Sequence, residues 1–551
     1  MAVSNLSKIF QRLSQGSVDS VQSGESLGTL DSYLHIDRPI ENEIKDKMSL
    51  IQKEGGGIVL LIGSAGDGKS HIISSLKSNY TDFNFYNDAT VSYSPQKTAV
   101  ETLCIALDSF NDNNINQTNQ KLLLAINLGK LNALIDYEPF KINFDTLVKT
   151  IKPLFGDKKQ IIEQSRIKII LFTDYQNFEF LKNDNSDYPI KSSFLSGILN
   201  KITSKTDNNP FYRAYLEDRK NDNNDKDPLI LNYELILNET VKDSIVKYVI
   251  ESIIRFHLNV TPREYFDFIY SIICYPKKYS QKNDFFEALI PSLLFEGGDN
   301  KIQKALSLLD PVKNNNREHD TDLSFLFTSF KIELNTLLNM NSIKVIPNSI
   351  IELTNKFYQN RGKDVERISR FYLRMKHLLN YHSDSKIYLS YLSVLKGIYN
   401  HNNKIMNDLY DLVMKAIPRH NGSYYCKENL IPLDIQGSNY KLFVKIKMKP
   451  QPISISLDDK FLSKFPLSFN MYWNCNGELI SLFMNYQLYE YLSLLEKGRF
   501  AVAYNNDRDI AFSKFLRELA EKSDQSEEVI FYSVEDQEFT LTESLGSIKL
   551  S

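Results

Sequence analysis

Apolar runs of strand length alternate with amphipathic stretches in the first third of the chain. The segment IVLLI at residues 58–62 is uniformly apolar and largely β-branched, a pattern typical of a strand covered on both faces of a parallel sheet. Comparable runs are FNFYN at 83–87, KLLLAIN at 121–127 and IKIILFT at 167–173. Helical periodicity lies between them, as in residues 98–110. Strands that alternate with helices indicate βαβ units, so we expect an open α/β sheet.

A helix is expected before the first strand. Pro39 suits a first helical position, and Glu41 and Glu43 then lie in the first turn, where they complement the helix dipole. The glycines at 55–57 should end this helix. Residues 1–30 are rich in Ser, Gly, Gln and Asp and are expected to form a loose arm.

The pattern changes twice further along the chain. Helical periodicity dominates from about residue 232 to about 418. Strict alternation in KLFVKIKMK at 441–449 then predicts a single half-exposed strand, and the Asn-Gly step at 476–477 predicts a hairpin. Two helices and a strand should follow, at 486–496, 509–522 and 529–534.

The length of 551 residues exceeds that of one ordinary domain. We expect an N-terminal arm and linker helix, an α/β domain, a helical lid with a helical region, and a small C-terminal α+β domain, at 1–50, 51–231, 232–425 and 426–551. The Asn/Asp-rich stretches at 111–119 and 204–227 predict surface loops.

Charge and cysteine content narrow the function classes. Lys and Arg number 65 and Asp and Glu 68, for a net charge of −3, which argues against a stand-alone non-specific nucleic-acid binder but not against a local basic face. Four dispersed cysteines form no C-x-x-C pair, which makes a zinc knuckle or a disulfide framework improbable. The start of the chain lacks the apolar core of a signal peptide, and no stretch of about 18 apolar residues appears. We expect a cytoplasmic protein.

One motif carries specific chemistry. It matches G-x-x-x-x-G-K-[ST] without gaps, after a predicted strand and before a helix expected at 71–77. Its glycines would let backbone N–H groups point at phosphate oxygens, the lysine would reach the β- and γ-phosphates of ATP, and the serine hydroxyl would bind Mg²⁺. The candidate cofactor-binding residues are Gly63, Ser64, Ala65, Gly66, Asp67, Gly68, Lys69, Ser70 and His71.

The plain alternative for this motif is a chance glycine turn. Asp67 occupies one of the variable positions, so its side chain is expected to face away from the phosphates. It could instead tune a neighbouring basic group.

Hydrolysis also needs an acidic residue that holds Mg²⁺ at a strand end, and a group that orients water. Asp88, Asn127 and Asp174 each follow an apolar strand, and ligands collect at such strand ends. Asp88 is the candidate second magnesium ligand beside Ser70. Asn127 resembles a sensor-1 asparagine. Each of the three could simply cap a strand.

Arg263 is a further catalytic candidate. In VTPREYFDFIY at 260–270, Thr261 should cap a helix, Pro262 should occupy its first position, and Arg263 should lie in the first turn. In an AAA+-type lid such an arginine acts as sensor 2; the alternative is a solvated arginine. An arginine finger from a neighbouring subunit is also conceivable, with Arg213 and Arg219 in a loop-like stretch.

A second basic feature lies further on. Arg367, Arg370 and Arg374 fall at i, i+3 and i+7 on one expected helical face. This face could contact DNA phosphates or an acidic partner. The preferred interpretation is an ordinary solvated face, balanced by Asp364 and Glu366.

Together these segments carry a resemblance. With IGSAGDGKSHIISSL, YLHIDRPIENEI, FYNDAT and LLLAINLGKLNAL, the chain resembles the DptF family of DNA phosphorothioation-dependent restriction proteins, over most of its length and including VTPREYFDFIY and the C-terminal part. The resemblance implies a P-loop, AAA+-like ATPase that acts in bacterial antiviral defence with G- and H-type partners against DNA that lacks the sulfur mark. The loop from Gly63 to Ser70 would bind the nucleotide, and Asp88 and Asn127 would be site residues.

The sequence departs from the ATPase pattern in one respect. Asp88 is followed by Ala89 rather than by glutamate, which leaves open a non-hydrolysing, ATP-gated scaffold. The third hypothesis is a P-loop kinase that transfers phosphate to a small molecule. No side-chain cluster typical of a nuclease is evident. We therefore assign DNA cleavage to a partner protein, and DNA contact to the complex with the G- and H-type partners. Homo-oligomerisation stays open.

Overall fold

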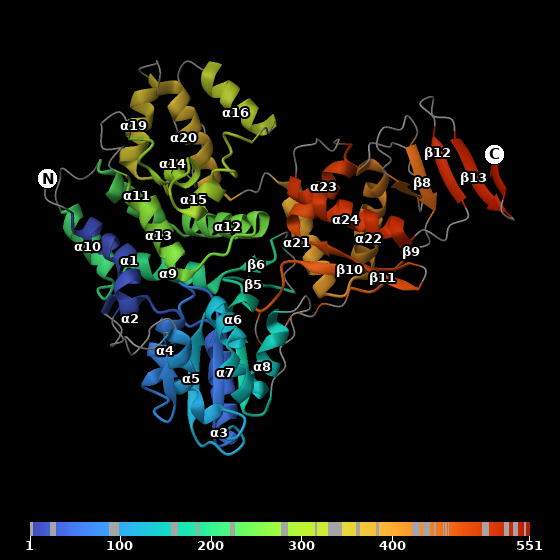
Figure 1. Cartoon of the computed structure of the whole chain (residues 1–551). Coiled ribbons are helices and arrows are strands. Elements are labelled where there is room, and N and C mark those ends of the chain that lie inside the picture. The colour runs from blue at the N-terminus through green and yellow to red at the C-terminus, as the bar shows by residue number, and fades with distance from the viewer. Residues whose placement is uncertain are drawn as a thin grey trace.

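The computed structural model describes most of the chain. The described residues are 4–22, 29–87, 98–155, 164–182, 186, 188–220, 226–276, 285–314, 317–328, 344–359, 364–381, 385–420, 430–433, 441–445, 448–453, 455, 457, 460, 462–475, 477–498, 506–522, 528–532, 538–544 and 547–551. The chain forms three lobes (Figure 1): a sheet lobe at the bottom of the view, a helical lobe above it, and a C-terminal lobe to the right.

The sheet lobe is built on four parallel strands, which confirms the expected α/β sheet. Their order is β2-β3-β1-β4, so the first strand lies inside the sheet between β3 and β4. Their bounds are Gly57–Ile62 for β1, Asn84–Tyr86 for β2, Lys121–Ile126 for β3 and Ile167–Leu171 for β4.

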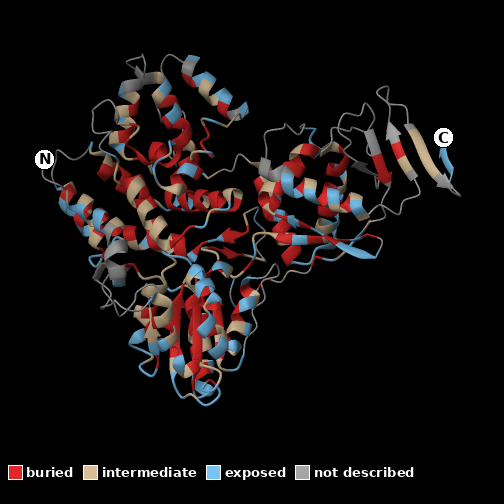
Figure 2. Cartoon of the chain, in the orientation of Figure 1, coloured by how far each residue is buried: buried red, intermediate tan, exposed pale blue. Residues whose placement is uncertain are grey.

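Helices cover both faces of this sheet, which explains why its strands are apolar throughout. Ile58, Leu60 and Ile62 of β1 pack into one core, and Val59 and Leu61 pack into the other. Figure 2 shows these strands buried between the helical layers. The first core is closed by α5 (Ala99–Ala106), α6 (Leu128–Asp136), α7 (Glu138–Asn143) and α8 (Asp145–Ile151), and the second by α3 (Pro39–Lys53) and α4 (Lys69–Lys77).

The start of α3 agrees with its sequence signals, except that Glu43 lies beyond the first turn, where Glu41 is the acidic residue. Pro39 is its first residue, and Glu41 accepts a hydrogen bond from the Arg38 N–H at 3.1 Å, so the first turn is capped by a residue three positions inside the helix. The helix ends at Lys53, and Gly55 follows with a φ of 80°.

The helical lobe contains the N-terminus, which corrects the expectation of a loose arm. Residues 5–22 form α1 (Asn5–Gln22), and Leu6, Phe10 and Leu13 are buried in the core of the helical lobe. Their spacing at i, i+4 and i+7 makes one apolar helix face. The short α2 (Thr29–Leu34) also belongs to this lobe and buries Leu34.

The other helices of this lobe extend on both sides of the expected boundary at residue 231. Helices α9, α10 and α11 share the core of the helical lobe, not that of the sheet. Residues 210–219 are helical, so the loop expected over 204–227, with Arg213 and Arg219 in it, is wrong there. The bounds are α9 (Ser193–Thr203), α10 (Pro210–Arg219), α11 (Pro228–Ile236), α12 (Glu239–Phe256), α13 (Pro262–Ile273), α14 (Ile290–Phe295), α15 (Lys301–Leu306), α16 (Arg317–Thr328), α19 (Asn348–Gln359) and α20 (Asp364–Leu379).

The C-terminal lobe begins before residue 426, because α21 and α22 pack on α23. Two antiparallel sheets flank these helices, in the orders β11-β10-β9 and β14-β13-β12-β8-β7. The bounds are α21 (Lys386–Tyr399), α22 (Asn403–His420), β7 (Leu430–Leu433), β8 (Lys441–Lys445), β9 (Met448–Pro450), β10 (Phe469–Cys475), β11 (Glu478–Met484), α23 (Tyr486–Glu496), α24 (Asn506–Lys522), β12 (Glu528–Tyr532), β13 (Glu538–Ser544) and β14 (Ser547–Leu550).

Two sequence expectations for this lobe meet different outcomes. The hairpin at the Asn-Gly step is confirmed, because β10 and β11 pair in antiparallel register around Gly477, which has a φ of 92°. The single strand expected over 441–449 is wrong: β8 pairs with β12, whereas β9 pairs with β10 in the other sheet.

The lobes are joined by backbone contacts. After β4, a two-stranded ribbon forms from β5 (Glu179–Phe180) and β6 (Ile190–Lys191). The Gln176 N–H donates to the Ser463 carbonyl at 2.8 Å, so the chain after β4 is tied to the C-terminal lobe. None of the helices in the described ranges combines the length and apolar composition of a membrane span. Cys104, Cys274 and Cys475 are free thiols.

Candidate nucleotide-binding site

The glycine-rich loop, residues 63–70, lies at the carboxyl edge of the parallel sheet. Ile62 pairs with Ile126 of β3 and with Leu171 of β4, so the loop begins where three strands end together. The Gly63 N–H donates to the Ile126 carbonyl at 3.2 Å. In open α/β sheets, ligands bind outside this edge.

The glycines of the loop are required by its shape. Gly66 and Gly68 have φ values of 87° and 86°, in the left-handed region that other residues rarely adopt. Gly63 is required by crowding, since a Cβ there would lie 2.9 Å from the Phe172 Cβ and 2.5 Å from the Asp67 Oδ2. These constraints argue against an incidental turn.

Helix α4 begins at Lys69 directly after the loop. Gly68 offers no side chain as a cap, and the N–H groups of a first helical turn have no partner within the helix. Ser70 and His71 belong to this turn, where a helix N-terminus favours an anion. The Lys69 ammonium folds back over the loop and donates to the Ser64 carbonyl at 2.5 Å.

Asp67 lies across the loop. Its carboxylate accepts the Ser64 N–H at 2.5 Å. That its side chain faces away from bound phosphates stays a prediction. Burial raises the pKa of this carboxyl above its ordinary value, and the cations Lys69 and Arg38 act in the opposite direction. The alternative interpretation, that Asp67 tunes a neighbouring basic group, agrees with this placement.

Arg38 is the main site residue that sequence reasoning missed. Its Nη1 donates to the Asp67 carbonyl at 2.7 Å, and its Nη2 lies 3.5 Å from the Asn177 Oδ1. The guanidinium lies over the rings of Phe172 and Phe194, 5.7 and 5.1 Å from their centroids. Phe172 follows β4 and Phe194 belongs to α9, so Arg38 bridges the sheet lobe and the helical lobe at the loop.

The charge of Arg38 is only partly balanced. Its acceptors in the described residues are a backbone carbonyl and an amide oxygen, not a carboxylate. Burial lowers its pKa, while the nearby charges of Asp67 and Glu41 oppose that shift. An anion beside the loop would therefore be attracted to Arg38. The only sequence signal was its place before the Pro39 helix start.

The first turn of α13 packs against the loop. Thr261 caps this helix and Pro262 is its first residue, as expected. The Thr261 Oγ1 lies 3.1 Å from the position that a Cβ on Gly66 would take. Arg263 is in this turn and half-buried, and it interacts electrostatically with Asp267 one turn along the helix. The structure thus brings the turn that carries Arg263 to the loop.

The three strand-end candidates have separate outcomes. Asn127 caps α6 at the end of β3, where its Oδ1 accepts the Lys130 N–H at 2.8 Å. Asp174 ends a 3₁₀ turn, Phe172–Asp174, after β4. Asp88 lies outside the described residues. Helix capping therefore accounts for the Asn127 Oδ1. This residue follows β3, the strand next to β1.

A pair of histidines adjoins the loop: His71, one of the cofactor-binding candidates from the sequence, and His35, which had no signal in the sequence. His71 of α4 lies with its Nε2 2.7 Å from the Nδ1 of His35. Burial first, and then the charges of His35 and Arg38, lower the pKa of His71 to about 4. His71 is therefore neutral near pH 7.

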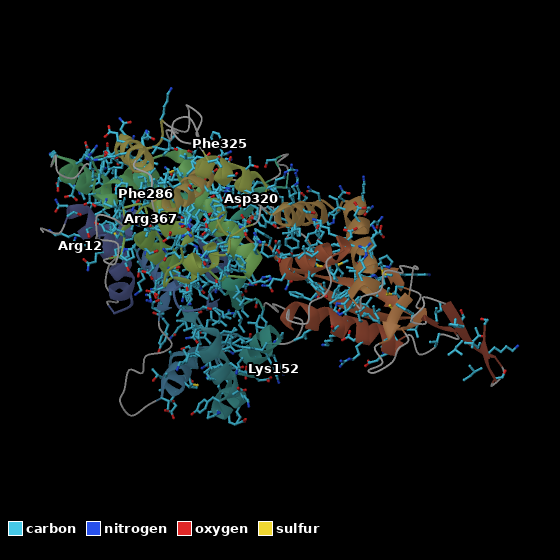
Figure 3. The ribbon with its side chains drawn as sticks, turned by 90° about the horizontal axis from the view of Figure 1, so that it is seen from above. Arg12, Lys152, Phe286, Asp320, Phe325 and Arg367 are labelled. Atoms are coloured by element: carbon cyan, nitrogen blue, oxygen red, sulfur yellow. The ribbon has the colours of Figure 1, made fainter. Side chains whose placement is uncertain are left out.

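The basic face expected on α20 is used inside the helical lobe. Arg374 binds Asp310 and Glu296 at 2.8 and 2.6 Å, and Arg367 binds Glu287 at 2.6 Å. Figure 3 labels Arg367 beside Phe286, the neighbour of Glu287. Arg374 is buried and Arg367 is half-buried, and both are paired with carboxylates, so the expected solvated face does not describe them.

Three other arginines lie away from the loop. Arg370 pairs with Glu366 on the exposed side of α20, as the solvated interpretation expects. Arg213 is exposed on α10, and Arg219 pairs with Glu234 at 3.1 Å. The structure does not bring any of them to residues 63–70.

Comparisons with known proteins add no relative: no family model, no curated protein and no solved structure matches this chain. The mixed α/β fold with its four-stranded parallel sheet, and the geometry around the loop, are the findings from which function is argued.

Proposed function

We propose that the chain binds ATP with Mg²⁺ at residues 63–70. One observation carries this proposal: a G-x-x-x-x-G-K-S loop joins an inner parallel strand to an uncapped helix, with Lys69 and Arg38 both directed at it. Backbone N–H groups, an ammonium and a guanidinium are the donors that phosphate groups need. Ser70 would bind Mg²⁺, and Asp88 would be its second ligand.

The strand order supports a P-loop, AAA+-like architecture. The strand before the loop lies between two parallel neighbours, and Asn127 follows the neighbour β3. Helix α13 packs against the loop from the helical lobe, as a lid would. In this proposal Asn127 positions the attacking water and Arg263 contacts the γ-phosphate when the lid closes.

We further propose that nucleotide use serves phosphorothioation-dependent DNA restriction. This step rests on the resemblance of the loop, FYNDAT and AINLGKLN segments to the DptF family. Arg367 and Arg374 are neutralised within the helical lobe, which favours DNA contact through G- and H-type partners over contact through this chain alone.

The second candidate function is an ATP-gated scaffold without hydrolysis. The specific observation in its favour is the sequence Asp88-Ala89, which lacks the usual adjacent glutamate. In this case ATP would stabilise one arrangement of the sheet and helical lobes. Both functions use the same loop, so Lys69→Ala should abolish ATP binding under either.

Turnover measurements separate the two candidates. Phosphate release should be measured for the full chain alone, with each partner protein, and with unmodified or phosphorothioated duplexes. The ATPase proposal expects release that increases with partners and unmodified DNA and disappears in Asp88→Ala. Binding of ATP without release under every condition would leave the scaffold. Release that depends strictly on a small-molecule acceptor would replace both with a kinase.

A further inference from the structure

Four side chains that the proposed ATP chemistry does not use converge next to the loop. His35 and Asp37 come from the segment before α3, Glu41 from the first turn of α3, and His71 from α4. One ligand atom from each of the first three lies within 4.8 Å of the other two.

The distances within the set fit one small cation. The His35 Nε2 lies 3.2 Å from the Asp37 Oδ1 and 3.6 Å from the Glu41 Oε2. Ligands bound to Zn²⁺ at about 2.0–2.2 Å in a tetrahedron lie roughly 3.3–3.6 Å from one another. Both separations from His35 are thus close to those that a shared metal ion would impose, and the two carboxylate oxygens lie within 4.8 Å of each other.

The surrounding hydrogen bonds orient the ligand atoms. Glu41 is only 2 % exposed; its Oε1 accepts the Arg38 N–H, which turns the Oε2 toward His35. The Nδ1 of His35 is hydrogen-bonded to His71 at 2.7 Å. When that hydrogen is on His35, the Nε2 faces two carboxylate oxygens, and either a second hydrogen or a metal ion can lie between them. A hydrogen bond from the second ring nitrogen is the usual support of a metal-binding histidine.

We propose that His35, Asp37 and Glu41 bind a divalent transition-metal ion, with His71 as a positioning residue. One imidazole and two carboxylates suit Zn²⁺, or Mn²⁺ and Fe²⁺, better than Mg²⁺, which prefers oxygen ligands and water. The Asp37 side chain is 82 % exposed, so water can reach the site and complete the coordination. This site is separate from the magnesium position proposed at Ser70.

The proposed metal site lies on both sides of Arg38 in the sequence, and this links it to the loop at residues 63–70. Arg38 lies between Asp37 and Glu41 in the sequence, and its guanidinium binds the loop through the Asp67 carbonyl. A metal ion at His35, Asp37 and Glu41 would cross-link both sides of this arginine. It would therefore hold the entry into α3 in one conformation and resist its local unfolding.

Metal titration of the full chain tests the proposal without reference to ATP. Protein that has been stripped with a chelator should take up one equivalent of Zn²⁺ in calorimetry. With Co²⁺ it should develop visible d–d absorption, which reports a nitrogen- and oxygen-bound, low-coordinate ion. Zn²⁺ should also raise the unfolding temperature of the stripped protein.

Variants tie the uptake to these residues. Asp37→Asn changes an exposed ligand and should leave the fold intact while removing the tight uptake. His71→Gln should weaken it by about 10- to 100-fold, as loss of a supporting hydrogen bond does. His401→Asn is the matched control, because His401 is an exposed histidine outside the set with a φ of 51°, which asparagine tolerates.

Two results would overturn the proposal. The first is no saturable uptake of Zn²⁺ or Co²⁺ by the stripped wild-type chain, which would leave His35 as a hydrogen-bond partner of Asp37. The second is equal uptake in the wild type, Asp37→Asn and His71→Gln, which would put the metal elsewhere. Loss of metal uptake in His401→Asn alone would also show that the metal binds elsewhere.

Discussion

Two arginines that are largely removed from water have opposite surroundings. Arg374 of the helical lobe is 5 % exposed and binds Asp310, which is fully buried, and Glu296. Burial opposes its charge, but the two carboxylates outweigh that cost and raise its pKa. Arg38 at the loop has a carbonyl and an amide oxygen as acceptors in the described residues, and burial lowers its pKa.

Under the proposed function, the difference separates a structural cation from one that is available to an anion. Arg374 has its counter-charge within the chain, so it stabilises the packing of α20 and has little left to offer a ligand. Arg38 is held in place by a carbonyl and two aromatic rings, and the nearby charges of Asp67 and Glu41 only partly oppose its burial. A phosphate beside residues 63–70 would supply a full counter-charge.

The largest expected effect is on stability, in the helical lobe. Arg374→Ala leaves the buried Asp310 without its cation, which should lower the free energy of unfolding by about 3–5 kcal/mol. Chemical denaturation of the full chain measures this. A loss below about 1 kcal/mol would contradict the role assigned to this pair.

The reverse pattern is expected at the loop. Arg38→Met keeps the apolar contacts with Phe172 and Phe194 and removes a buried, partly balanced charge. The free energy of unfolding should stay within about 1 kcal/mol of the wild type. The affinity for ATP should fall by about 10- to 100-fold, since a charge-assisted hydrogen bond is worth about 1.5–3 kcal/mol.

Calorimetry with ATP and denaturation of the same protein check both parts of this prediction. The distinction between the two arginines would fail if folded Arg374→Ala lost affinity for ATP. It would also fail if Arg38→Met lost stability instead of affinity for ATP.

A smaller effect is expected from the one acidic side chain in the loop. Asp67→Asn keeps an acceptor for the Ser64 N–H and removes a negative charge beside the proposed phosphates. The affinity for ATP should rise by roughly fivefold, because removal of a like charge is worth at least about 1 kcal/mol.

The stability of the same variant relative to the wild type should depend on pH. The pKa of Asp67 is raised in the folded chain, so ionisation costs stability as pH rises through that folded pKa. Asp67→Asn avoids this cost. The gain in stability of Asp67→Asn over the wild type should be complete near pH 7. It should vanish below pH 3.8, the ordinary pKa of an aspartate. Denaturation curves at several pH values measure it, and a gain that grows on acidification would contradict the assigned sign.

The smallest effect serves as the control. Arg370 and Glu366 form an exposed pair one turn from Arg374 on α20. Arg370→Ala should change the free energy of unfolding by about 0.5 kcal/mol or less and leave ATP affinity unchanged. A loss of several kcal/mol would show that burial of the partner carboxylate is not what distinguishes Arg374.

Local patterns predicted the sheet and the loop well. The strands, the Pro39 helix start, the Thr261 cap and the Gly477 hairpin depend on neighbours a few residues apart, and their signals are present in the sequence. Helix α1 shows a limit of composition: its Ser-rich sequence suggested an arm, but Leu6, Phe10 and Leu13 form a buried face.

Contacts between distant segments could not be predicted in the same way. Helical spacing places Arg367 and Arg374 on one face, but their partner carboxylates come from other elements of the lobe. Arg38 reaches the loop only because the fold brings it to the rings of Phe172 and Phe194, over which its guanidinium lies. Likewise, alternation continues through 441–449, although β8 and β9 join different sheets.

The most direct test of the account is calorimetric titration of the full chain with ATP and Mg²⁺, beside Lys69→Ala and Arg370→Ala. The account predicts saturable binding of one ATP to the wild type, equal binding to Arg370→Ala, and none to Lys69→Ala. No binding to the folded wild type, or binding that survives in Lys69→Ala, would contradict it.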